Sequence, residues 1–118
     1  MPEDFKILVV DNEPLVRLGI VVMLREQGWR TMSAEGMTSA VEIIDQGYQP
    51  DLLITDQNMP DFTGIALGEM LIERMADMKV LIVSGDDLEN DVPPGWRSLA
   101  KPFTSAELFA KISELFPD

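Results

Sequence analysis

The sequence predicts an α/β fold in which helices cover a parallel β-sheet. Short β-rich runs alternate along the chain with segments of helical periodicity, which is typical of this class. The first run, residues 6–10, is apolar throughout, as a strand must be when helices bury both of its faces. The chain has 118 residues, close to the commonest domain size, so we expect one domain over residues 1–118.

The first helix is expected to begin at Pro14, because the first helical turn does not need the N–H that proline lacks. It runs to about Gln27, and Gly28 stops it. Its apolar face carries Leu15, Leu18 and Val22. A weaker strand follows at residues 29–33.

A second helix and a second buried strand come next. Ser39 and Glu42 have the spacing of a capping box, which is expected to open a helix that ends at Gly47. Residues 51–55 have an apolar centre and are expected to form a strand that ends on Asp56. This strand and the first one would occupy the middle of the sheet.

The second half of the chain begins with a loop over residues 57–63. It leads into a third helix at about residues 65–75, and residues 79–83 form a strand that ends on Ser84. The stretch 85–95 contains two adjacent prolines, which interrupt helical hydrogen bonding. It therefore leaves room for only a short helical turn or two.

Residues 96–100 are expected to form the fifth strand, which Lys101 follows. Thr104 and Glu107 form another capping box, which opens a terminal helix. The inward face of this helix carries Leu108, Ile112 and Leu115. The count is five strands and about five helices, a (βα)5 chain with no internal linker and no repeat.

Polar side chains stand at the ends of four predicted strands. They are Asp11 and Asn12 after the first strand, Asp56 after the third, Ser84 after the fourth and Lys101 after the fifth. In open α/β sheets ligands bind beyond the carboxyl ends of the strands, so we expect these groups to converge. Clustered carboxylates repel one another unless a cation lies among them, and oxygen ligands suit Mg²⁺ or Ca²⁺.

The same groups suit phosphoryl transfer to Asp56. A carboxylate can attack a phosphoryl group and form an aspartyl phosphate. The negative charge on the three phosphoryl oxygens can then be compensated by three groups. These are the metal, the Lys101 ammonium, and the Ser84 hydroxyl with nearby backbone N–H groups. We therefore expect a phosphorylation-switched signalling domain rather than an ordinary enzyme.

The composition argues against several other classes of function. The chain has no cysteine and no histidine, which removes thiol chemistry and the usual transition-metal ligands. Its formal net charge of −12 disfavours direct binding to nucleic acid, since that affinity comes largely from clustered basic residues. No apolar run is long enough for membrane insertion, and the N-terminus lacks the pattern of a signal peptide, so a cytoplasmic location is expected.

Four short segments, in order and at predicted strand ends, carry a resemblance to a known family. They are Ile7-Leu8-Val9-Val10-Asp11, Asp56-Gln57-Asn58-Met59-Pro60 with Gly64, Val83-Ser84, and Lys101-Pro102-Phe103. Through them the chain resembles the CheY-like receiver domain of two-component response regulators over essentially its whole length. The resemblance implies a flavodoxin-like (βα)5 three-layer sandwich whose five parallel strands lie in the order 2-1-3-4-5.

The resemblance also implies roles for single residues. It implies that a histidine kinase or a histidine phosphotransfer protein phosphorylates Asp56, and that Mg²⁺ is required. Asp11 would hold the metal through water, and the Asn58 backbone carbonyl would bind it directly beside Asp56. Lys101 would contact the phosphoryl group and form a cis bond to the following proline. Ser84 would swing towards the phosphorylated site as the switch.

Asn12 stands where the family usually has a second acidic residue. Its amide oxygen can still bind Mg²⁺, but one negative charge is missing, so we expect binding weaker by about 1–2 kcal/mol. Glu13 offers a carboxylate that could supply this charge. The simpler interpretation is that Glu13 caps the helix that starts next to Pro14.

Two further departures concern the route by which the signal leaves the site. The family's switch aromatic normally lies three residues before the lysine, and that position is Ser98. Trp96 lies two positions away on the same strand face, either as a replacement or simply as a core residue. The interval from Ser84 to Lys101 is also shorter than usual, so the fourth helix is expected to be short or absent.

Two alternatives to a phosphoacceptor remain open. Asn12 and Ser98 favour a non-phosphorylated pseudo-receiver, which would be a pure interaction module. The spacing of Asp11 and Glu13 loosely fits a haloacid-dehalogenase-like phosphatase, although the chain is short for that fold and Asp56 has the better nucleophile environment. The downstream protein partner is left open in every case.

Overall fold

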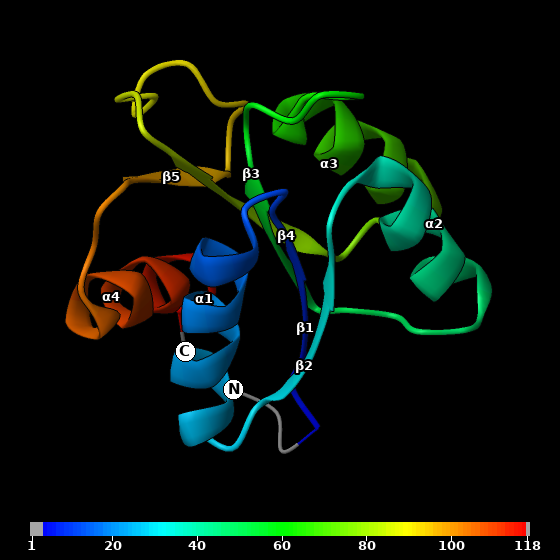
Figure 1. Ribbon diagram of the computed structural model, residues 1–118, viewed down its shortest axis with the longest axis horizontal. Helices are drawn as coiled ribbons and strands as arrows, with labels where there is room; N and C mark the ends of the chain where they lie inside the picture. Colours follow the sequence, from blue (N-terminus) through cyan, green and yellow to red (C-terminus); the bar gives the residue numbers. More distant parts are fainter. Residues whose placement is uncertain (1–3, 118) are drawn as a thin grey trace.

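A computed structural model describes residues 4–117, in which five strands form one parallel sheet (Figure 1). The strands are β1 (Lys6–Val10), β2 (Arg30–Ala34), β3 (Leu52–Asp56), β4 (Lys79–Ser84) and β5 (Arg97–Ala100). Their order is β2-β1-β3-β4-β5, and every neighbouring pair is parallel. The predicted fold class and strand order are therefore confirmed.

Four helices cover the two faces of the sheet in the described range. They are α1 (Pro14–Glu26), α2 (Met37–Asp45), α3 (Gly64–Arg74) and α4 (Ser105–Leu115). Helices α1 and α4 lie on one face, and α2 and α3 lie on the other (Figure 1). None of these helices is long and apolar enough to span a bilayer.

The central strands are apolar on both faces because helices cover both. In β1, Ile7 and Val9 pack with α1 and α4, while Leu8 and Val10 pack with α2 and α3. Strand β3 is buried over its whole length. Polar side chains can therefore reach solvent only near the strand ends, which is where the candidate site lies.

The predicted count of about five helices was one too high for residues 4–117. The segment 85–96 joins β4 to β5 through turns rather than a helix. In it the Asp91 N–H donates to the Leu88 carbonyl, and the Trp96 N–H donates to the Pro93 carbonyl. The paired prolines withhold two backbone donors, so a helix cannot run through residues 93–94 to the start of β5.

The apolar face predicted for α1 was the wrong one. The three residues assigned to it are exposed, at 84% for Leu15, 57% for Leu18 and 46% for Val22. The residues that α1 buries are Ile20, Val21 and Leu24. Both sets have helical spacing, because α1 is apolar around more of its circumference than a helix covering a sheet requires.

The two predicted capping boxes had different outcomes. Helix α2 begins at Met37 without a side-chain cap, and Ser39 instead accepts the Glu35 N–H at 3.2 Å. This local bond satisfies the serine and removes the expected cap. At α4 the predicted box between Thr104 and Glu107 is present, and the predicted inward face is buried.

Candidate functional site

Three of the predicted residues meet beyond the carboxyl ends of β1, β3 and β5. The Lys101 Nζ lies 3.0 Å from Asp11 Oδ2 and 3.4 Å from Asp56 Oδ1. Asp11 is fully buried and Asp56 is only 4% exposed. The parallel order of the strands brings these groups together from positions 11, 56 and 101.

Asp11 is held on both its backbone and its side chain. The Asp11 N–H donates to the Ala34 carbonyl at 3.1 Å, and the Asp11 carbonyl accepts a hydrogen bond from the Arg17 guanidinium at 2.6 Å. Its carboxylate accepts the Glu13 N–H at 2.9 Å through Oδ1 and the Lys101 ammonium through Oδ2. Both carboxylate oxygens are therefore oriented before any ligand arrives.

Asp56 is the last residue of β3, and the turn after it is fixed by Gln57. The Gln57 carbonyl accepts the Gly64 N–H at 3.1 Å, and its side-chain Oε1 accepts the Ile65 N–H at 2.9 Å. Thr63 caps α3 by accepting the Ala66 N–H. A side chain at Gly64 would overlap the Asp56 carbonyl oxygen, so the start of α3 lies directly against the predicted acceptor.

Ser84 ends β4 beside Lys101 and is 1% exposed. Its carbonyl accepts the Lys101 N–H at 2.7 Å, and its hydroxyl accepts the Asp86 N–H at 3.2 Å. The bond between Lys101 and Pro102 is cis, as the resemblance implied. The hydroxyl is therefore tied to the segment that follows β4, not to Asp56.

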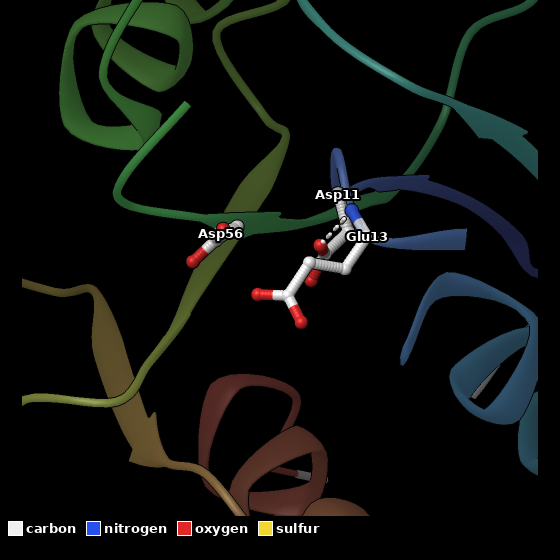
Figure 2. A group of neighbouring side chains, drawn as sticks. All are labelled: Asp11, Glu13 and Asp56. Carbon is white, nitrogen blue, oxygen red and sulfur yellow. Dashed lines mark hydrogen bonds between the residues drawn. The ribbon is translucent and has the colours of Figure 1, made fainter. Parts of the chain in front are cut away.

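Glu13 adds a third carboxylate to the site. One oxygen atom from each of Asp11, Glu13 and Asp56 lies within 4.8 Å of the other two, and Figure 2 shows the Glu13 side chain extending into the space between the two aspartates. Glu13 occupies the N-cap position of α1, but its side chain makes no capping hydrogen bond. Glu13 therefore stands at the start of α1 as the simpler interpretation expected, but its carboxylate lies with those of Asp11 and Asp56 instead of capping the helix.

The two asparagines predicted as metal ligands lie at the edge of the site. Asn12 is exposed and lines a groove of about 590 Å³ with Pro60 and Asp61. Asn58 is exposed in the loop after β3 and forms an isolated bridge with Thr63. Among residues 4–117 no side-chain hydrogen bond joins Asn12 to the two aspartates and Lys101. Asn58 does reach the cluster, because a hydrogen bond from its backbone acts to lower the pKa of Asp56.

The site shifts the pKa values of its own groups. Burial raises the pKa of Asp56 above its ordinary 3.8; the Lys101 ammonium opposes this shift and the Asp11 carboxylate adds to it. For Lys101, burial alone lowers the pKa. The hydrogen bond and charge of Asp11, with the charge of Asp56, outweigh it and leave the pKa raised. Lys101 therefore stays an ammonium at neutral pH.

The cluster fits a hard divalent cation. Three carboxylates against one ammonium leave two formal negative charges at a site where both aspartates are buried and Glu13 is exposed. All the available metal ligands are oxygen atoms, which Mg²⁺ prefers. The donor set and its charge therefore fit a hard cation such as Mg²⁺.

Replacing Asp56 by asparagine is expected to raise the melting temperature in EDTA at pH 7. A folded-state pKa above the unfolded value means that ionised Asp56 lowers stability at neutral pH, and that this penalty disappears as pH falls through the folded pKa towards 3.8. The gain from Asp56→Asn should therefore shrink in acid. Thermal melts at pH 7 and pH 4 measure this, with exposed Asp77→Asn as a control. A lower melting temperature for Asp56→Asn at pH 7 would contradict the assignment of an electrostatic penalty.

Comparison with known proteins identifies the family. The family model for the response regulator receiver domain matches residues 7–113. The chain is 33% identical over 119 residues to the chemotaxis protein CheY of Pseudomonas aeruginosa, covering 94% of this chain and 95% of CheY. It is 34% identical over 89 residues to the transcriptional regulatory protein DegU of Brevibacillus brevis. That match covers 74% of this chain but only 37% of DegU.

A solved structure agrees with the sequence matches. The response regulator TrrA of Thermotoga maritima, in complex with Mg²⁺ and BeF, superposes with a TM-score of 0.81 at 26% identity. The match covers 95% of this chain and 99% of TrrA. Receiver domains are signalling phosphoacceptor modules, not classical enzymes, and they bind Mg²⁺ at an acidic site. This chain belongs to the response regulator receiver domain family.

Proposed function

We propose that Asp56 accepts a phosphoryl group and that this modification switches the protein contacts of one cytoplasmic receiver domain, residues 1–118. The observation that supports this proposal most is the Lys101 ammonium, which lies between the buried carboxylates of Asp11 and Asp56. An interaction module has no need of a buried lysine shared by two aspartates. A site that must stabilise added phosphoryl charge does need one.

The proposed donor is a phosphohistidine of a histidine kinase or of a histidine phosphotransfer protein. An oxygen of Asp56 attacks the phosphorus, a P–O bond forms as the P–N bond breaks, and the imidazole nitrogen keeps the electron pair. Lys101 compensates one phosphoryl oxygen, and the Ser84 hydroxyl turns to donate to another.

Mg²⁺ would supply the remaining positive charge for the phosphoryl oxygens. The residues proposed to hold it are Asp11, Asp56, the Asn58 backbone carbonyl and, through its amide oxygen, Asn12. We add Glu13 to this set, because its carboxylate faces the same space and replaces the charge that Asn12 lacks.

Loss of the Glu13 charge is expected to weaken Mg²⁺ binding by about tenfold, or ~1–2 kcal/mol. The test compares Mg²⁺ titrations of the wild type, Glu13→Gln and Asn12→Asp by calorimetry, without phosphodonor. Asn12→Asp should bind more tightly than the wild type, and Glu26→Gln, at the exposed far end of α1, should be unchanged. Equal affinities for the wild type and Glu13→Gln would contradict a role for Glu13 at the metal.

The exposed face of α1 supports a protein as the phosphodonor. Leu15 and Leu18 are largely exposed, and a groove of about 420 Å³ beside them is lined by Val16, Met23 and Phe103 and reaches Lys101. Apolar surface this close to a reactive carboxylate is suited to a docked helix that presents its histidine. Formation of a complex on this face would align the donor nitrogen with Asp56.

Beryllofluoride with Mg²⁺ tests the proposal, because it mimics a phosphoryl group on a carboxylate. Fluorine NMR should show a bound signal with the wild type that is absent from Asp56→Asn and retained by Asp51→Asn. No bound signal with the wild type would favour the pseudo-receiver, the alternative that Asn12 and Ser98 support. Turnover of a phosphomonoester that Asp11→Ala abolishes and Asp56→Ala retains would instead indicate a phosphatase; membership of the receiver family argues against that outcome.

A further inference from the structure

The segment 85–96 is attached to the rest of the molecule near both of its ends. At its start the Asp86 N–H donates to the Ser84 hydroxyl at 3.2 Å. At its end the ring of Trp96 lies against Gly68 in the middle of α3. Leu88 and Val92 pack half-buried on the same core cluster, which also includes residues of α2 and α3.

Gly68 has a packing reason for being glycine. A Cβ atom there would lie 2.5 Å from Trp96 Cη2 and 3.0 Å from its Cζ3, so the indole rests directly on the helix backbone. Glycine in a helix interior is unfavourable relative to alanine, and the contact with Trp96 offsets this. Gly68 and Trp96 therefore form a fitted pair between α3 and the segment 85–96.

The same face of α3 touches the acceptor one turn earlier. Gly64 and Gly68 are four residues apart, which places them on one face about 6 Å apart along the helix axis. Gly64 lies against the Asp56 carbonyl oxygen. One turn of helix thus separates the backbone of the predicted acceptor from the ring of Trp96.

Ser84 shares a face of the sheet with Trp96. Side chains alternate along β4, and Ile82 packs in the cluster that contains Trp96, so Ser84, two residues on, points to the same side. Ser98 pairs with Ile82 in the sheet and also points to that side. Because residue 98 is a serine, the aromatic side chain at this end of the segment 85–96 is that of Trp96.

We propose that Trp96, seated on Gly68, is the aromatic side chain through which this domain reports the state of Asp56. This inference rests on the proposed function, in which the Ser84 side chain turns towards Asp56 and so carries its oxygen away from the Asp86 N–H. The Asp86 N–H then loses its partner, the segment 85–95 moves, and Trp96 becomes more exposed on α3. Ser98, at the position of the family's usual switch aromatic, has no ring that could report the state of Asp56.

Trp96 fluorescence in a Trp29→Phe background tests the inference, because Trp96 is then the single tryptophan. Beryllofluoride with Mg²⁺ should shift its emission to the red in proportion to the bound fluorine NMR signal. A bound signal with unchanged emission overturns the inference and leaves the proposed function intact. Absence of the bound signal overturns both.

Two matched pairs of variants locate the effect. Gly68→Ala should give red-shifted emission before any addition, whereas Gly19→Ala in α1, where a Cβ meets nothing within 4 Å, should not. Asp86→Pro removes the N–H that Ser84 accepts and should also shift the emission, whereas Asp86→Ala keeps this N–H and should not. If Gly68→Ala fails to fold, the Asp86 pair decides: equal emission from its two members overturns the inference.

Discussion

Lys101→Ala is expected to slow phosphorylation of Asp56 by a small phosphodonor by about 10²–10³-fold. Loss of one preorganised group that stabilises transition-state charge typically has an effect of this size. The Lys101 ammonium is already 3.4 Å from Asp56 Oδ1 and is held by Asp11 at 3.0 Å, so it needs little movement to meet the phosphoryl group. Rates with acetyl phosphate at saturating Mg²⁺, followed by intact mass, give this comparison.

The matched control is Lys111→Ala. Lys111 lies on α4, and its ion pair within residues 4–117 is a 3.8 Å contact with Glu114, which contributes little at a surface. Its replacement should leave the rate unchanged. A Lys101→Ala rate within a few-fold of the wild type would mean that the metal alone compensates the phosphoryl charge, which contradicts the role given to this lysine.

Gly64→Ala is expected to destabilise the fold by about 3 kcal/mol, the upper part of the usual range for overpacked sites. The new methyl group would overlap the Asp56 carbonyl oxygen and press on the Thr55 side chain, and backbone at the end of a central strand has little room to move. The acceptor itself would then shift. Urea denaturation measures the loss of free energy of unfolding.

Gly19→Ala is the control for this substitution. Gly19 is also inside a helix, but its Cβ position is open, so alanine should stabilise the protein by up to about 1 kcal/mol through helix propensity. If the free energy of unfolding falls for Gly64→Ala and rises for Gly19→Ala, the effect at Gly64 comes from its contact with Asp56 and not from glycine in helices generally. Equal stability of Gly64→Ala and the wild type would show that Asp56 tolerates displacement of α3.

Much of the fold and the centre of the site could be predicted from the sequence, and the physical reason is the parallel sheet. Strands buried on both faces must be continuously apolar, so the first polar residue after each run marks a strand end. Asp11 and Ser84 were found in this way. Asp56 follows Thr55, and Lys101 follows a strand that contains Arg97 and Ser98, so these two were placed by the alternation of strands and helices along the chain. The structure brings them to one edge, although their chemical roles remain proposals.

Features that depend on three-dimensional packing could not be predicted. The periodicity of α1 offered two apolar faces, and only the sheet decides that Leu24 is buried and Leu15 is not. The position of the Glu13 backbone depends on the Asp11 carboxylate, which accepts the Glu13 N–H, and no local pattern shows that the Glu13 carboxylate joins the aspartates. The contact between Gly68 and Trp96 joins residues 28 positions apart, and no local pattern marks it.

Intact-mass analysis after incubation with acetyl phosphate and Mg²⁺ tests the central claim most directly. We expect the wild type to gain one phosphoryl group, peptide mapping to locate it on Asp56, and EDTA to abolish the reaction. Asp56→Asn should gain none. Failure of the wild type to gain a phosphoryl group with Mg²⁺ present, or its attachment to Asp11 instead, would contradict the proposal that Asp56 is the acceptor.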